Sequence, residues 1–272
     1  MDNLALTPTL AEKALEYLGC AHNSPSIRYL NQLIRAYLCH VPWESVTRII
    51  KRHSTPKTAD CPRWPEEFWN DALELGAGGT CFENNLAFHA LLVSLGFQGY
   101  LTVNDMADRH ACHTANIVTL QGRKYLVDVA IPLHCALPVC ADRVTRRSTR
   151  FHYYTVRPSG EAVFEIARSH HPKRYIFTLL DTPVRLDAYR AAVARDYGAQ
   201  GYFLDYVIIV KVVGNRLWRF SSIERPYCLE GFDKTSRQAV NLSPESLSEV
   251  LAGHFGLRAS SIAEAMALVP RG

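Results

Sequence analysis

Long apolar runs, paired cysteines and a strong excess of either charge are all missing from this 272-residue sequence. Residues 1–8 carry neither a basic nor an apolar segment, so no secretory signal is predicted. The most apolar stretch, 202–213, is too short and too interrupted to span a bilayer. The net charge of +4 is small, and the basic runs at 143–150 and 172–174 are interpreted as solvated surface. We therefore expect a cytoplasmic protein with no membrane or nucleic-acid partner.

The arrangement of the eight cysteines also argues against metal binding. They form no Cys-x-x-Cys pair, and the closest two, Cys135 and Cys140, lack histidines at a zinc-like spacing. The adjacent His170 and His171 have no evident third ligand. We expect reduced thiols, no metal and no permanently bound cofactor.

The hydrophobic pattern changes along the chain from helical to β-rich. Apolar residues at helical spacing predict helices over 10–19, 27–38, 65–76, 81–96, 186–196 and 244–255. Alternating patterns predict strands over 114–120, 125–129, 151–156, 163–167, 175–179, 207–213 and 216–220. With 48% hydrophobic residues, the chain can bury a large core as one domain or as two to three lobes.

Cys81 is the cysteine whose position suggests chemistry. It follows Gly78 and Gly79 and begins a predicted helix. Free N–H groups and the positive end of the helix dipole favour the thiolate there, which is the reactive form of cysteine. Taken alone, the residue is more readily interpreted as a buried cysteine at the start of a helix.

A predicted hairpin places a histidine and an aspartate on one face of a sheet. If Gln121-Gly122 forms a two-residue turn, the register sets Ala115 opposite Asp128. His113 is then a diagonal neighbour of Asp128, with backbones roughly 7–8 Å apart, within reach of the two side chains. This arrangement predicts Cys81 as nucleophile, His113 as base and Asp128 as the residue that orients the histidine.

The same residues could also have structural roles and no part in catalysis. Asp128 could be a strand-end residue and His113 a surface histidine, although a carboxylate inside the apolar run 125–129 needs a partner. His110 is a weaker candidate base because it lies in a predicted polar loop. Cys112 is a poor candidate nucleophile because its side chain points to the opposite face from Asp128.

These segments resemble the arylamine N-acetyltransferase family. The matching motifs are Gly78-Gly79-Thr80-Cys81-Phe82-Glu83-Asn84-Asn85, the strand 113–118, and Tyr125-Leu126-Val127-Asp128-Val129. His40-Val41-Pro42-Trp43-Glu44-Ser45 and His254-Phe255-Gly256-Leu257 are similar to the family's flanking elements. The resemblance covers nearly the whole chain, and Trp43 with Asn84-Asn85 makes it closer to filamentous-fungal than to bacterial members.

The resemblance implies an α+β multi-lobe fold around a cysteine-protease-like Cys-His-Asp core. The lobes would be an N-terminal helical bundle (1–97) with the nucleophile, a central β-barrel (98–198) with the histidine and aspartate, and a C-terminal α/β lid (199–272). It also implies a ping-pong reaction. Cys81 would take an acyl group from acetyl-CoA or another acyl-CoA and pass it to a small-molecule amine.

The sequence departs from the family pattern around the expected pocket. Ala77 stands where an arginine is usual, so Glu44 needs another partner or must face water. Ile131 replaces an aromatic residue that lines the acceptor pocket, which weakens the stacking of a flat arylamine. Thr80, Ile131 and Phe203 are the substrate contacts that the resemblance predicts.

Other functions remain open at this stage. An amide synthase that releases a polyketide or peptide from a carrier protein keeps the chemistry and changes the partners. A cysteine peptidase or a transglutaminase-like hydrolase shares the order of Cys, His and Asp. A binding module with an impaired site would be consistent with Ala77 and Pro132.

Overall fold

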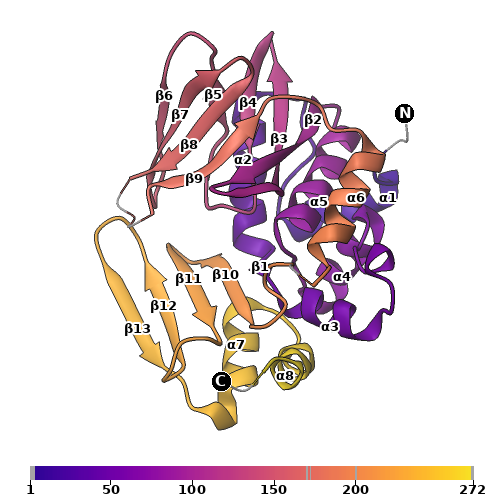
Figure 1. The fold of residues 1–272 in the computed structure, drawn as a ribbon, viewed down its shortest axis with the longest axis vertical. Coiled ribbons are helices and arrows are strands. Elements are labelled where there is room, and N and C mark those ends of the chain that lie inside the picture. Colours follow the sequence, from indigo (N-terminus) through magenta and orange to yellow (C-terminus); the bar gives the residue numbers. More distant parts are fainter. Residues whose placement is uncertain (1–3, 170, 172, 200, 271–272) are drawn as a thin grey trace.

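The computed structural model describes residues 4–169, 171, 173–199 and 201–270. Figure 1 shows an eight-stranded sheet at the top, a group of helices beside it, and a smaller sheet with two helices below. This is the multi-lobe α+β architecture expected from the resemblance. The boundaries predicted between the lobes stay a prediction.

The N-terminal part is helical. Its elements are α1 (Pro8–Tyr17), α2 (Ile27–His40), β1 (Trp43–Glu44), α3 (Val46–Ser54), η1 (Thr58–Asp60), α4 (Pro65–Leu75) and α5 (Cys81–Ser94). The hydroxyls of Thr7 and Ser26 cap α1 and α2, and α4 begins with a proline and ends at Gly76 with φ of 65°. Helix α5 is buried along almost its whole length. The other helices therefore hold the nucleophile helix in the centre of this lobe.

The central part is a nearly closed antiparallel sheet. Its strands are β2 (Gln98–Met106), β3 (Arg109–Leu120), β4 (Arg123–Val127), β5 (Leu137–Val139), β6 (Thr145–Ser148), β7 (Tyr153–Gly160), β8 (Val163–Arg168) and β9 (Tyr175–Leu180). They pair in the order β5-β4-β3-β2-β9-β8-β7-β6. Thr145 donates its hydroxyl to the carbonyl of Pro138, which links the two outermost strands. The enclosed side chains form a separate apolar core.

The turn between β3 and β4 confirms the predicted hairpin. Leu120 pairs with Arg123, and Gln121 and Gly122 both have positive φ, as a type I′ turn requires. Because Asn116 pairs with Val127, Asp128 follows directly after the end of β4. The strand predicted over 125–129 therefore begins and ends two residues earlier than expected.

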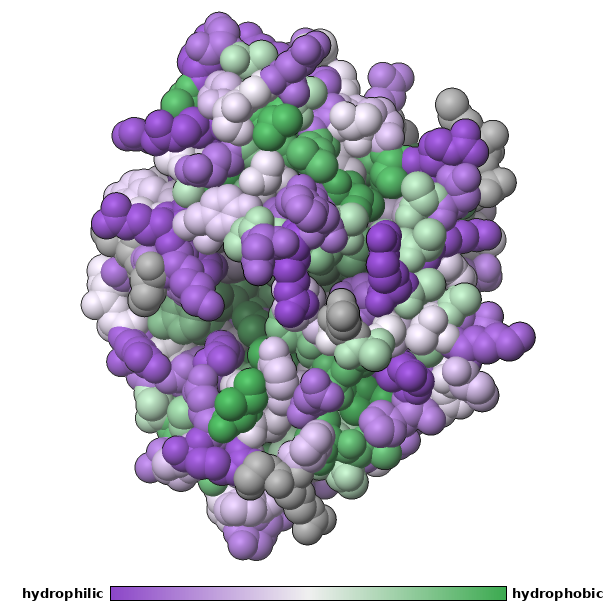
Figure 2. All heavy atoms as spheres, in the orientation of Figure 1, coloured by the Kyte–Doolittle hydropathy of each residue, from purple (hydrophilic) through white to green (hydrophobic). Residues whose placement is uncertain are grey.

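The C-terminal part forms the second sheet. It contains β10 (Ile208–Val213), β11 (Arg216–Ser221), β12 (Cys228–Phe232), β13 (Arg237–Asn241), η2 (Pro244–Ser246), α7 (Leu247–Phe255) and α8 (Ala259–Leu268). Strand β1 joins this sheet beside β10, with Trp43 opposite Val210. Figure 2 shows the surface hollowed between the two sheets, with hydrophobic residues deep in the hollow.

Two elements near the site differ from expectation. Helix α3 and strand β2 were not predicted, because polar residues interrupt the apolar spacing of each. Helix α6 (Leu186–Asp196) comes after the last strand of the large sheet but packs against the first turn of α5, and Tyr189 donates its hydroxyl to the carbonyl of Phe82 at 2.6 Å. Among the described residues, no helix combines the length and apolarity that a membrane span requires.

Candidate active site

Cys81 is the first residue of α5 and lies at the end of a tightly packed loop. A Cβ added to Gly78 would come within 1.7 Å of the carbonyl oxygen of Pro42, and one added to Gly79 within 2.6 Å of Glu83 Oε2. The two glycines are therefore required for the close approach of the loop to its neighbours. The Cys81 side chain is 9% exposed, and its Sγ lies 3.9 Å from the carbonyl oxygen of Cys112.

His113 and Asp128 are in direct contact. His113 Nε2 lies 2.7 Å from Asp128 Oδ2 in an almost completely buried pair. The other carboxylate oxygen, Oδ1, accepts hydrogen bonds from the side-chain amide of Asn85 and from the backbone N–H of Ala130, each at 2.9 Å. Both carboxylate oxygens are satisfied, which a buried carboxylate requires.

The charge of Asp128 controls the protonation of His113. Burial alone lowers the pKa of an imidazole, but the nearby carboxylate and the hydrogen bond to it outweigh burial and raise the pKa of His113 to about 10. The Cys81 thiol also hydrogen-bonds the ring and adds to this increase. Because Nε2 faces Asp128, Nδ1 is the nitrogen available to the thiol.

The arrangement brings together the three residues singled out in the sequence. The Cys81 thiol lies at a helix N-terminus and beside an imidazole that can exchange a proton with it. Such a pair can attack a carbonyl carbon and then protonate a leaving group. Asn85, which the sequence analysis quoted as part of a motif without giving it a role, completes the shell around Asp128.

Glu44 does not face water, although Ala77 leaves it without the expected arginine. Its carboxylate is fully buried and accepts hydrogen bonds from Thr47 and from the backbone N–H of Gly78 at 3.2 Å. Burial raises its pKa, and the charge of Arg63 opposes that increase. Arg63, from the loop before α4, thus supplies the cation that position 77 lacks. The sequence analysis missed this residue.

Two of the three predicted substrate contacts lie beside Trp43, and the third lies at the start of α5. Thr80 is buried at the N-terminus of α5. Ile131 lines a narrow apolar cleft together with Trp43. The ring of Phe203 meets that of Trp43 edge-on, with centroids 4.8 Å apart. Trp43, which the sequence analysis assigned to packing, therefore connects these elements, and it also bridges to Gly79.

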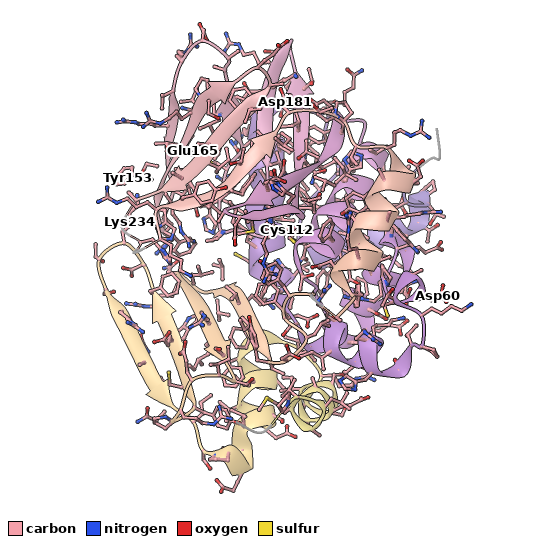
Figure 3. The ribbon with its side chains drawn as sticks, in the orientation of Figure 1. Asp60, Cys112, Tyr153, Glu165, Asp181 and Lys234 are labelled. Atoms are coloured by element: carbon pink, nitrogen blue, oxygen red, sulfur yellow. The ribbon has the colours of Figure 1, made fainter. Side chains whose placement is uncertain are left out.

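A wider and more polar cleft opens beside the nucleophile. It has a volume of about 570 Å³ and is lined by Arg109, His110, Cys112, Arg195 and Tyr202, among others. Cys112, labelled in Figure 3, belongs both to this cleft and to the surroundings of the Cys81 thiol. The one acid in the lining, Asp196, is paired with Arg48 at 2.9 Å. The cleft therefore carries an excess of positive charge.

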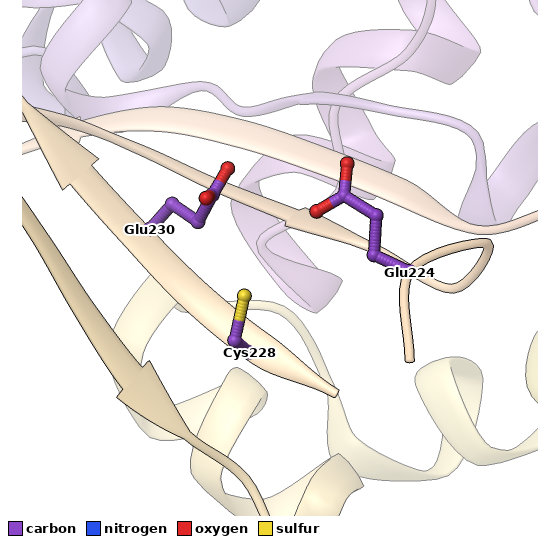
Figure 4. Close-up of side chains that lie close together, drawn as sticks. All are labelled: Glu224, Cys228 and Glu230. Atoms are coloured by element: carbon purple, nitrogen blue, oxygen red, sulfur yellow. The ribbon is translucent and has the colours of Figure 1, made fainter. Parts of the chain in front are cut away.

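One group of possible metal ligands lies away from this site, in the small sheet. Glu224, Cys228 and Glu230 place their ligand atoms within 4.8 Å of one another (Figure 4). Arg219 pairs with both glutamates, and Arg237 pairs with Glu230. Because arginine already neutralises the carboxylates, we assign no metal to this group.

Comparisons with known proteins agree on the fold. The chain is similar to the arylamine N-acetyltransferase of Mycobacterium abscessus, with 19% identity, a TM-score of 0.76 and coverage of 94% of both chains. It is also similar to the Mycobacterium marinum arylamine N-acetyltransferase in complex with CoA, with 15% identity, a TM-score of 0.77 and coverage of 92% of this chain and 93% of that one.

Sequence comparison gives a partial match and a nearly complete one. Proansamycin X synthase of Amycolatopsis mediterranei (strain S699) is 26% identical over 128 residues, which are 44% of this chain and about half of that protein, 48%. The model of the N-acetyltransferase family matches residues 26–262. None of these comparisons tests the predicted affinity to fungal members. The chain belongs to the N-acetyltransferase family.

Proposed function

We propose that this enzyme transfers an acyl group from a thioester to an amine through an acyl-Cys81 intermediate. The observation that carries the proposal is the contact of the Cys81 thiol with a His113 ring that Asp128 holds from the other side. In this proposal Cys81 is the nucleophile, His113 the acid and base, and Asp128 the residue that fixes the tautomer of the ring.

In this proposal the first half-reaction starts from a thiolate on Cys81 and an imidazolium on His113. The Cys81 thiolate attacks the thioester carbonyl, the carbon–sulfur bond of the donor breaks, and the imidazolium of His113 gives its proton to the departing thiolate. The backbone N–H groups at the start of α5 are free to stabilise the oxyanion of the tetrahedral intermediate.

The second half-reaction returns the site to its starting state. An amine attacks the acyl-Cys81 carbonyl, neutral His113 accepts the proton of the amine, and the Cys81 thiolate leaves. The amide is released, and Cys81 and His113 are again a thiolate and an imidazolium. We assign the apolar part of the amine to the neighbourhood of Trp43, which Ile131 and the ring of Phe203 share, and Thr80 stays a predicted contact at the start of α5.

The basic cleft supports a phosphate-bearing thioester as the donor. Arg109 and Arg195 gather positive charge beside the entrance to Cys81. A volume of about 570 Å³ falls within the range of small-molecule sites. Acyl-CoA carries such phosphates, and the similar M. marinum enzyme is known in complex with CoA.

Intact and peptide mass spectrometry tests the first half-reaction directly. The protein is incubated with acetyl-CoA, and separately with malonyl-CoA, without any amine, beside a Cys81→Ser variant. We expect one acyl adduct, located on Cys81, that disappears when amines are added. An inert Cys81 that gives no adduct and does not react with iodoacetamide would refute the proposal.

A second candidate function is an amide synthase that accepts its acyl group from a carrier protein. The similarity to proansamycin X synthase and the positive charge of the cleft favour it, because carrier proteins are acidic and present a phosphorylated arm. Under this alternative Cys81 reacts with iodoacetamide but takes no acyl group from any small acyl-CoA. Acylation by a loaded carrier protein, lost in Arg109→Glu and retained in Arg143→Glu, would identify it.

A further inference from the structure

Arg63 is a buried cation that contacts the loop in front of the nucleophile. Its side chain is 1% exposed, and its guanidinium donates to Glu83 Oε2 at 2.7 Å and to the carbonyl of Gly78. The same nitrogen reaches Thr47 Oγ1 at 3.0 Å, and the other terminal nitrogen pairs with Asp71 at 3.1 Å. The fork of the guanidinium thus joins the loop to α3, α4 and α5.

The peptide groups on both sides of Gly78 are held by this cluster. Its carbonyl accepts from Arg63, while its N–H donates to Glu44. The next carbonyl, that of Gly79, accepts from the side chain of Asn84. Since Gly78 lies three residues before Cys81 in the chain, these bonds fix the path by which the loop enters α5.

The charges of the cluster depend on Arg63. Glu44 and Glu83 are both buried, and the described part of the chain contains no other Lys or Arg ion-paired with either. Burial raises the pKa of Glu83, but the charge and hydrogen bonds of Arg63 outweigh burial and lower it. Tyr197 of the segment after α6 also donates to Glu83, at 2.9 Å.

We propose that Arg63 is a positioning residue for Cys81. Acting through Gly78 and Glu83, it sets the loop so that the thiol meets the ring of His113. The inference rests on the proposed role of Cys81 as nucleophile. It assigns the anchoring of the loop to a residue eighteen positions before the nucleophile in the chain, in place of position 77 next to Gly78.

The test compares two buried arginines. Arg63→Lys keeps the charge but loses the fork, and Arg48→Lys makes the same change at a side chain that is also 1% exposed and touches neither Gly78 nor Glu83. Alkylation of Cys81 by iodoacetamide is followed by peptide mass spectrometry, and folding by circular dichroism. This readout needs no acyl donor, so it is independent of whether the enzyme acylates itself.

We expect Arg63→Lys to slow alkylation of Cys81 by about tenfold or more, and Arg48→Lys to change it little, at comparable losses of thermal stability. In steady-state assays, Arg63→Lys should lower kcat while the KM for the donor changes little. A folded Arg63→Lys variant that alkylates at the rate of the wild type would overturn the proposal.

If Arg63→Lys does not fold, a milder variant still tests the role of Arg63. Asp71 is a partly exposed partner of Arg63, and its side chain reaches the loop only through that contact. Asp71→Ala should slow alkylation of Cys81 by about threefold, whereas Asp60→Ala, at an exposed position, should leave it unchanged. An unchanged rate in Asp71→Ala would contradict the role of Arg63.

Discussion

The side-chain amide of Asn85 donates to Oδ1 of Asp128 at 2.9 Å, on the opposite side of the carboxylate from His113. The same amide nitrogen reaches the carbonyl of Thr114, and the amide oxygen accepts from the backbone N–H of Val129. Asn85 therefore connects the nucleophile helix to both segments of the hairpin. Together with the backbone N–H of Ala130, this side chain of α5 orients the carboxylate toward His113.

Replacing Asn85 should affect both catalysis and stability. We expect Asn85→Ala to lower kcat by about tenfold, because Asp128 loses one of its two side-chain partners. It should lower the free energy of unfolding by about 1–3 kcal/mol, because buried polar groups lose their hydrogen bonds. Urea denaturation and steady-state kinetics measure the two effects. Asn31→Ala in α2, which removes a contact with the N–H of Ala136 in the loop before β5, should reduce stability only.

Asp128→Asn should remove the negative charge that raises the pKa of His113. Without the carboxylate, the pKa of His113 should fall from about 10 to below its ordinary value of 6.5, because burial then dominates. We expect kcat to fall by about 10⁴, since an amide no longer holds the correct tautomer. NMR titration of labelled histidine checks the pKa. An unchanged titration in the variant would show that Asp128 is not the controlling group.

The same pair makes stability depend on pH in a defined direction. Because the pKa of His113 is higher in the folded state than its ordinary value of 6.5, its contribution is complete below about pH 6.5 and is lost as pH rises through about 10. The difference in free energy of unfolding between wild type and Asp128→Asn should therefore decrease from pH 6 to pH 10. A difference that grows with pH would contradict the assignment.

Phe203→Ala should separate the two half-reactions. The variant loses the edge-on contact with Trp43, in which the ring centroids are 4.8 Å apart. We propose that these two rings contact the amine and not the acyl donor. The rate of Cys81 acylation should stay near that of the wild type, while transfer to an aromatic amine should fall by about 2- to 10-fold, the equivalent of one aromatic contact. Single-turnover mass spectrometry follows each step. A matched fall in both steps would place Phe203 outside the amine site.

Gly79→Ala should act on the nucleophile loop without changing any charge. The added Cβ meets Glu83 Oε2 at 2.6 Å and the guanidinium of Arg63 at 3.2 Å, so the ion pair has to shift. We expect slower alkylation of Cys81 and a lower melting temperature. Gly253→Ala, in α7 where nothing lies within 4 Å, should instead raise stability by about 0.5–1 kcal/mol and leave alkylation unchanged.

The hairpin could be predicted from sequence because its determinants are local. Gln121-Gly122 favours one turn type, and that turn fixes the register in which β3 and β4 pair. His113 and Asp128 are only fifteen residues apart, so a simple count along two strands brings them together. The position of Cys81 at the start of a helix could be predicted from the two glycines before it and from the resemblance to the family.

Arg63 and the basic cleft could not be predicted in the same way. Arg63 lies in a loop without periodicity, and its partners come from three different helices and a glycine turn. Arg109 of β3 and Arg195 of α6 are far apart in sequence and line one cleft only because α6 packs beside β3 and the start of the nucleophile helix. Such contacts depend on tertiary packing, which no local pattern encodes.

The bridge from Trp43 to both Gly79 and β10 has a consequence for biosynthesis. Trp43 and Gly79 leave the ribosome early, but the strand that holds Trp43 in place begins at Ile208. A nascent chain therefore carries its cysteine long before the scaffold around it can form. We expect ribosome-bound chains that end before β10 to have a Cys81 of ordinary thiol reactivity. Reactivity should appear only once β10 has been synthesised and can pair with Trp43.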